Sequence, residues 1–106
     1  AVTEALAFGA RLGLDMDRLI AVLSSGAAGN WFLDQRGLTM TRGDFAPGFK
    51  LNLHHKDLKI GLAMAEALGM ALPLAEMTAG HYGQLMAEGH GDEDISALYR
   101  LKRPGA

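Results

Sequence analysis

The chain contains no cysteine, only three prolines and no long run of apolar residues. The lack of cysteine excludes a disulfide scaffold, a zinc–thiolate site and a cysteine nucleophile. Because no apolar run reaches about 18 residues, the sequence predicts no membrane-spanning helix. No signal-peptide pattern opens the chain, so we expect a cytoplasmic setting and no membrane partner.

An excess of charge of either sign is also missing. Ten Lys and Arg stand against twelve Asp and Glu, which gives a formal net charge of −2 over 106 residues. This balance argues against a nucleic-acid partner, because such proteins carry a basic footprint. With 49% hydrophobic residues, the chain has the material for one folded domain.

Helical spacing of apolar residues recurs along the chain, and no segment alternates with a period of two. We therefore predict an all-α fold. Gly13 should stop the first helix, Asp15 or Asp17 should cap the second, and Pro73 should open the fifth. The expected helices are 1–13, 16–25, 31–40 with a break near Gly37, 50–69, 73–88 and 95–102.

The first helix begins without any residue that could cap it, since Ala1 and Val2 already follow the helical pattern. One interpretation is a frayed terminus of a processed protein. The other, which we favour, is that the upstream part of this helix belongs to a longer chain.

The helix predicted at 50–69 carries the clearest anomaly. Asp57 lies near the middle of its apolar arc, between Leu53 and Ile60, and Lys56 lies at the border of that arc. A buried carboxylate needs hydrogen-bond donors or a changed pKa. Asp57 could therefore bond the backbone N–H groups of a neighbouring loop, or it could face a ligand cleft. Lys56 is either a ligand contact or a surface lysine.

Other features are weaker. The loop at 26–30 could bind an anion or simply be a tight connection, and it matches no known phosphate-binding motif. His54 and His55 are adjacent, so on a helix their rings diverge by about 100° and cannot share a metal. We expect no metal site. Gly80 and Gly83 within one helix suggest close approach of a second helix.

Four segments, taken in order, resemble the C-terminal domain of the β-hydroxyacid dehydrogenases, a family that includes 3-hydroxyisobutyrate dehydrogenase and tartronate semialdehyde reductase. They are Gly-Ala-Ala-Gly-Asn-Trp (26–31), Gly-Asp-Phe-Ala-Pro-Gly-Phe (43–49), Lys-Asp-Leu (56–58) and Gly-His-Gly-Asp-Glu-Asp-Ile-Ser-Ala-Leu (89–98). The resemblance extends over essentially the whole chain.

The resemblance implies that residues 1–106 form a compact bundle of about six helices, like the C-terminal domain of 6-phosphogluconate dehydrogenase. An N-terminal Rossmann domain binding NAD or NADP would precede it and is absent from this chain. By the same resemblance, Lys56 lies beside the nicotinamide and Phe49 lines the cleft. Asp57, Trp31 and Asn30 would support that cleft, and Asn30 stands where a serine is common.

The family's acid/base lysine lies upstream of this chain, so the resemblance places no catalytic residue within it. The implied function is that of one cleft wall, and of a dimer surface, in an NAD(P)-dependent enzyme acting on a small β-hydroxy acid. We expect the chain alone to be inactive and the intact enzyme to be a homodimer or higher oligomer. The alternative is a non-enzymatic helical module for dimerisation or interaction, which the high glycine and methionine content would suit.

Overall fold

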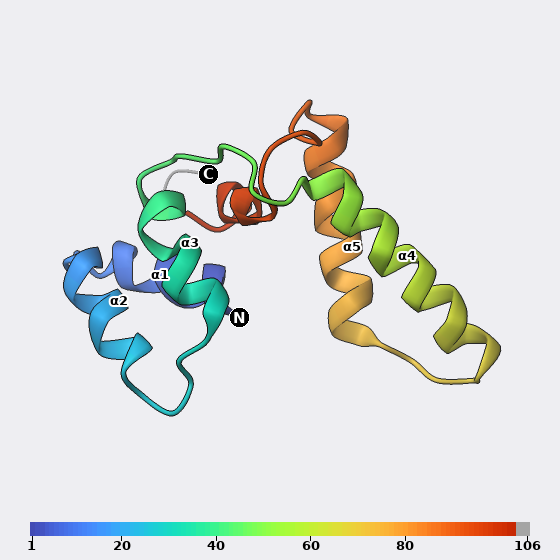
Figure 1. Cartoon of the computed structure of the whole chain (residues 1–106), viewed down its shortest axis with the longest axis horizontal. Helices are drawn as coiled ribbons and strands as arrows, with labels where there is room; N and C mark the ends of the chain where they lie inside the picture. The colour runs from blue at the N-terminus through green and yellow to red at the C-terminus, as the bar shows by residue number, and fades with distance from the viewer. Residues whose placement is uncertain (104–106) are drawn as a thin grey trace. The chain divides into compact units, whose positions relative to one another are not determined.

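The computed structural model describes residues 1–103. Within them the chain is all-α with no strand, which confirms the predicted fold class. The helices are α1 (Val2–Arg11), α2 (Met16–Ser24), α3 (Trp31–Thr41), α4 (Leu51–Ala67), α5 (Pro73–Ala87) and the 3-10 helix η1 (Ile95–Leu101) (Figure 1). Contacts divide the chain into two units: unit 1 holds Ala1–Phe45 and the described residues from Leu98 onward, and unit 2 holds Ala46–Ala97.

Local sequence signals set most helix ends. The Asp15 side chain caps α2 by accepting a hydrogen bond from the Arg18 amide at 3.2 Å. Pro73 lies in the first turn of α5, where its missing N–H leaves no helical bond unmade. These two expectations and the stop at Gly13 are confirmed. Glycines with positive φ follow four of the helices: Gly13, Gly43, Gly69 and Gly89.

Unit 1 is built from α1, α2 and α3, each of which contacts the other two. Gly37 on α3 is buried against α2, where a Cβ added to it would lie 3.1 Å from Ile20 Cδ1. The predicted break in the helix near Gly37 is therefore wrong: α3 is continuous, because this glycine allows two helices to pack closely. The buried apolar side chains of unit 1 are Leu6, Ala7, Ile20, Leu33, Met40, Phe45 and Tyr99.

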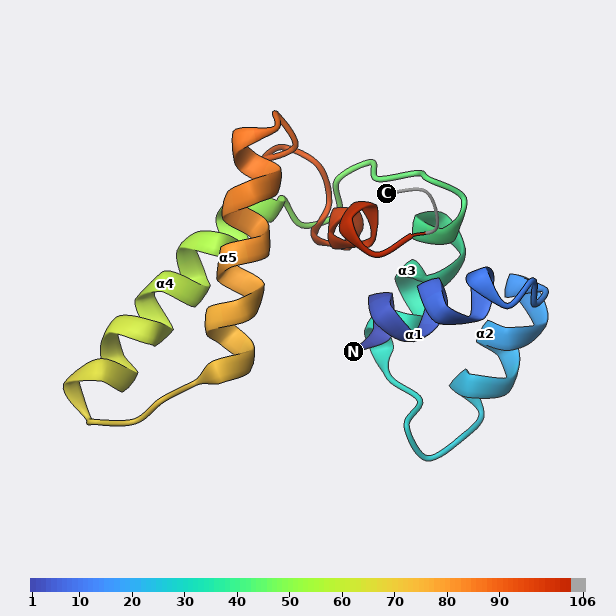
Figure 2. The same cartoon turned by 180° about the vertical axis from the view of Figure 1, so that it is seen from behind.

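Unit 2 is the hairpin of α4 and α5, which lie side by side (Figure 2), together with the segments that flank it. Leu51 and Ala65 of α4 are buried, as are Ala79, Tyr82 and Leu85 of α5. The close helix approach predicted at Gly80 and Gly83 is wrong for the described residues. A Cβ at either position would meet no atom within 4 Å. These glycines face open space.

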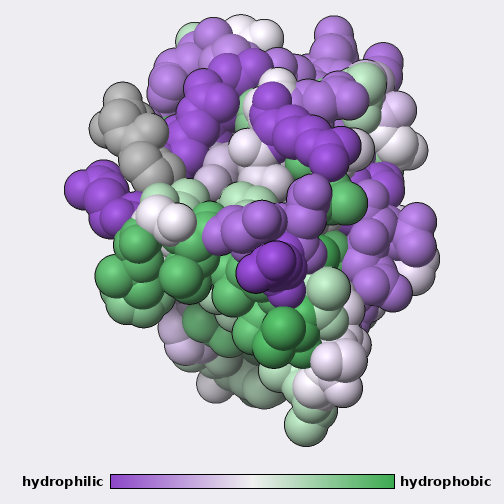
Figure 3. Space-filling model, turned by 90° about the vertical axis from the view of Figure 1, so that its left-hand side faces the viewer, coloured by the Kyte–Doolittle hydropathy of each residue, from purple (hydrophilic) through white to green (hydrophobic). Residues whose placement is uncertain are grey.

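Part of the surface of unit 1 is apolar. Phe8, Leu12, Leu14 and Val22 are all at least 49% exposed. In the view of Figure 3, onto the side where α2 lies, hydrophobic residues form an area next to strongly hydrophilic ones. No described helix is both long and apolar enough to cross a membrane.

Candidate functional site

The turn that leads into α4 is held by a buried carboxylate. Asp94 is 1% exposed, and its Oδ1 accepts hydrogen bonds from the Gly48 and Phe49 amides, both at 3.0 Å. Its Oδ2 accepts from the amide and the hydroxyl of Ser96. Four donors thus compensate the desolvation of this charge. The backbone of Phe49, the predicted cleft-lining residue, is fixed by this arrangement.

The start of α4 is also joined to the segment that contains Asp94. Lys50 caps α4 without a side-chain hydrogen bond, and the first helical amides turn instead to carbonyl groups of that segment. The Leu51 amide donates to the Glu93 carbonyl at 2.8 Å, and the Asn52 amide donates to the Gly91 carbonyl at 2.9 Å. These donors are therefore already used within the chain and do not offer an anion site.

Three rings follow from this turn across the helix hairpin. The Phe49 and His54 ring centroids are 5.5 Å apart, and those of His54 and Tyr82 are 5.4 Å apart. His54 Nδ1 and the Tyr82 hydroxyl form a 2.9 Å hydrogen bond. Burial raises the pKa of Tyr82 to about 12, and the charge of Asp94 adds to the effect. Tyr82 therefore remains a neutral phenol at ordinary pH.

Lys56 and Asp57 both lie exposed on α4. The expectation that Asp57 is buried in an apolar arc is wrong, because α5 packs on the opposite side of α4, where Leu51 and Ala65 are buried. Much of the predicted arc is instead uncovered. We call this surface the α4 outer face, and its members are Leu53, Lys56, Asp57, Ile60 and Met64, with the three apolar residues 50–64% exposed.

Asn30 and Trp31 lie in unit 1, at the start of α3. The Asn30 side chain caps this helix by accepting from the Leu33 amide at 2.9 Å, and it donates to the Ala28 carbonyl at 3.1 Å. Trp31 is 63% exposed, and the Arg36 guanidinium lies 5.2 Å from its ring centroid. The loop at 26–30 is therefore a tight connection that ends in a helix cap, as one of the two interpretations expected.

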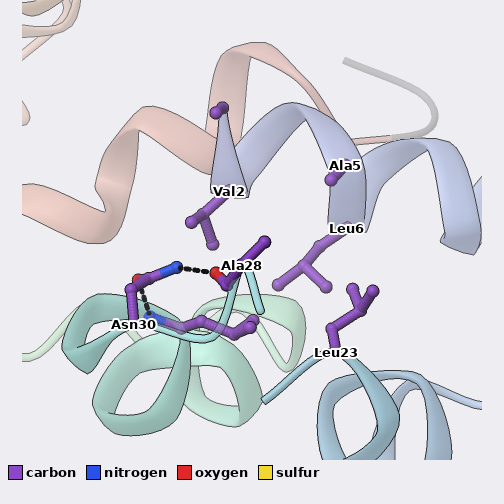
Figure 4. Close-up of a pocket in the computed structure, with 8 residues that line it drawn as sticks. Val2, Ala5, Leu6, Leu23, Ala28 and Asn30 are labelled. Atoms are coloured by element: carbon purple, nitrogen blue, oxygen red, sulfur yellow. Dashed lines mark hydrogen bonds between the residues drawn. The ribbon is translucent and has the colours of Figure 1, made fainter. Parts of the chain in front are cut away.

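A groove of about 180 Å³ lies beside this cap (Figure 4). Asn30 is the one polar residue that lines it, and its side chain is engaged with Ala28 and the α3 backbone. The groove therefore offers shape and apolar surface but no acid or base. Its lining residues are Ala1, Val2, Ala5, Leu6, Leu23, Ala28, Asn30 and Leu33.

Among the described residues, no group of three or more His, Asp or Glu side chains could hold a metal ion. Of the residues predicted from sequence, Phe49, Lys56 and Asp57 belong to unit 2, whereas Asn30 and Trp31 belong to unit 1. Sequence reasoning missed Asp94, His54 and Tyr82 as parts of the site. For Asp94 a signal exists, since an Asp two residues before Ser96 at a helix start is a typical capping pattern.

Comparison with known proteins finds relatives that match nearly the whole chain. The family model described as "NAD-binding of NADP-dependent 3-hydroxyisobutyrate dehydrogenase" matches residues 1–102. The 2-hydroxy-3-oxopropionate reductase of Escherichia coli is 38% identical over 98 residues, which are 92% of this chain and 34% of that protein. A probable mitochondrial 3-hydroxyisobutyrate dehydrogenase-like protein of Arabidopsis thaliana is 36% identical, over 92% of this chain and 29% of its own length.

The crystal structure of 3-hydroxyisobutyrate dehydrogenase from Salmonella typhimurium superposes with a TM-score of 0.87 at 30% identity. The match covers 94% of this chain and 35% of that one. The chain therefore spans about a third of the length of the relatives that it matches.

Proposed function

Because this chain belongs to the NAD-binding family of NADP-dependent 3-hydroxyisobutyrate dehydrogenases, we propose that it provides one wall of the active-site cleft in such an enzyme. A Rossmann domain, outside this chain, would bind most of the NAD or NADP. The enzyme would move a hydride between the nicotinamide and the hydroxyl-bearing carbon of a small β-hydroxy acid, and the dinucleotide would supply that chemistry. A cytoplasmic location stays a prediction, since one relative is named as mitochondrial.

The observation that carries this proposal is the α4 outer face. A carboxylate and a lysine stand there among apolar side chains that are half or more exposed. Apolar patches rimmed by charged groups are typical of surfaces that bind a ligand or a partner. A cofactor ring and its flanking polar groups need both kinds of contact, so this surface fits the nicotinamide end of a dinucleotide.

Each residue then has a role that its position allows. Lys56 has a flexible stem and three N–H donors, which can reach a carboxamide, hydroxyl or carboxylate oxygen. Asp57 is the next residue on the same helix, about 100° around it from Lys56, and its carboxylate would support the same region of the cleft. The Phe49 ring, at the entrance to α4, would wall the cleft and exclude water. The supporting roles of Trp31 and Asn30 stay a separate prediction within unit 1, where Asn30 caps α3.

The test uses the intact dehydrogenase that contains this chain. Lys56→Ala should lower kcat/KM for the dinucleotide about tenfold, or about 1.4 kcal/mol, because a charged contact is lost. Lys59→Ala is the matched control, since Lys59 is also exposed on α4 but lies outside the outer face. Unchanged kinetics in Lys56→Ala would remove Lys56 from the site. Dehydrogenase activity of the 106-residue chain alone would contradict the proposal as a whole.

The exposed apolar residues also favour a second candidate, a surface for self-association. Leu74 and Met77 of α5 are 80% and 57% exposed. We infer that the intact protein forms a homodimer or higher oligomer and that this helical domain contributes to the interface. Sedimentation at several concentrations tests this inference. A stable dimer of an intact protein that shows no NAD(P)-linked activity would favour the non-enzymatic interaction module instead.

A further inference from the structure

We propose that His54 and Tyr82 are positioning residues that hold the Phe49 side chain at the entrance to α4. This inference rests on the proposed function, in which Phe49 lines the cleft. Neither residue belongs to the α4 outer face, so neither is expected to touch the cofactor directly.

The Tyr82 phenol is buried and bonded to His54. Tyr82 is 3% exposed, and a buried hydroxyl without a partner is costly, so its 2.9 Å bond to His54 Nδ1 is a strong constraint. The Tyr82 hydroxyl can donate to His54 Nδ1 or accept from it, depending on the imidazole tautomer, and in both cases the bond joins the same two atoms. The bond therefore fixes the orientation of the His54 ring.

The His54 ring contacts the Phe49 ring as well as Tyr82. The His54 ring lies between those of Tyr82 and Phe49, with centroid separations of 5.4 and 5.5 Å and tilts of 58° and 43°. Tilted arrangements at this distance are favourable for aromatic pairs. The orientation that Tyr82 imposes on His54 is thus passed on to Phe49.

The backbone and the side chain of Phe49 are held by different residues. The Phe49 amide is held by Asp94, whereas its ring contacts a residue that is tied to α5. Asp94 alone would leave the ring free to rotate about its side-chain torsions. The contact with the His54 ring, which is itself bonded to α5, restricts this freedom. An oriented wall is what a cleft for hydride transfer requires.

One experiment tests the contact itself, without reference to activity. In NMR spectra of the 106-residue chain, cross-relaxation between the Phe49 and His54 rings should be present in the wild type. It should be lost or weakened in Tyr82→Phe, which removes only the hydroxyl. Tyr99→Phe is the matched control, because Tyr99 is equally buried at 3% and belongs to unit 1. A contact that persists unchanged in Tyr82→Phe overturns the proposal.

A second experiment tests the consequence in the intact dehydrogenase. Tyr82→Phe should lower kcat about fivefold, because orientation acts on the chemical step. It should have no further effect in a Phe49→Leu background, because its influence passes through the Phe49 ring. A merely structural role would give the same loss in both backgrounds, and that result would overturn the proposal.

The two failures can be told apart. If Phe49→Leu is as active as the wild type, the proposed place of Phe49 in the cleft is wrong, while the NMR contact still decides whether His54 and Tyr82 position the ring.

Discussion

Replacing Asp94 with alanine removes one acceptor group that serves four donors. The Gly48, Phe49 and Ser96 amides each lie 3.0 Å from a carboxylate oxygen, and the Ser96 hydroxyl makes the fourth bond. A buried donor left without a partner costs about 1–3 kcal/mol, and water entering the vacated space recovers part of this. We therefore expect Asp94→Ala to lower the free energy of unfolding by about 3–4 kcal/mol.

Asparagine gives a graded test of the same site. Asp94→Asn keeps one oxygen for the Gly48 and Phe49 amides but turns an NH₂ group toward the Ser96 amide. The expected loss is about 1–2 kcal/mol. Asp92→Ala is the matched control, because Asp92 is exposed. Its two contacts, a 3.1 Å hydrogen bond from Asn52 Nδ2 and a 3.8 Å ion pair with Lys50, should together contribute less than about 1 kcal/mol.

The measurement is urea unfolding monitored by the circular dichroism signal of the helices. The NMR chemical shifts of the Gly48 and Phe49 amides are recorded in parallel. The loss in the free energy of unfolding should be largest for Asp94→Ala, smaller for Asp94→Asn and smallest for Asp92→Ala. An Asp94→Ala chain that unfolds at the same urea concentration as Asp92→Ala would refute this expectation.

Three further predictions concern single positions. Gly37→Ala should lower the free energy of unfolding by about 1 kcal/mol, because crowding against Ile20 exceeds the gain in helix propensity. Gly80→Ala should raise the free energy of unfolding by up to about 1 kcal/mol, because Gly80 faces open space and only the gain in helix propensity remains. Urea unfolding checks both, and changes of the same sign would contradict the packing. Asn30→Ala should lower the free energy of unfolding by about 1 kcal/mol, because the α3 cap is lost. Asn30→Ser should retain most of this stability, and thermal unfolding of both variants checks the difference. The raised pKa of Tyr82 means that the folded chain holds this proton more tightly, so the Tyr82 contribution is intact below pH 10 and about 3 kcal/mol is lost as pH rises toward 12. Stability measured between pH 9 and 12 should therefore fall less steeply in Tyr82→Phe.

Local signals made the helices predictable. Asp15, Gly13 and Pro73 act on backbone groups within one turn of themselves, so their effect can be seen in a short stretch of sequence. The role of a glycine inside a helix is harder to predict from sequence. Gly37 and Gly80 look alike in sequence, but one faces Ile20 and the other faces open space. Only the packing partner distinguishes a glycine needed for close approach from one that is not.

In the candidate site, too, local patterns are predictable from sequence and packing partners are not. Periodicity correctly placed Asp57 among apolar residues on one side of a helix, but it could not tell whether another element covers that side. One of the two roles predicted for Asp57, that of a carboxylate that bonds loop amides, is performed by Asp94. Asp94 lies 45 residues from Phe49, and no pattern within a single helix connects positions that far apart.

The Asp94 hydrogen bonds also connect distant parts of unit 2. They join residues 45 and 46 positions apart, so they close a loop that contains the whole α4–α5 hairpin. Closing such a loop costs chain entropy that local helix formation does not, and contacts of this kind slow folding. We therefore expect the Gly48 and Phe49 amides to be protected from solvent exchange while the hairpin and its flanking segments are closed together. Their exchange rates should then report on the opening of unit 2, whereas amides near the helix ends also exchange through local fraying.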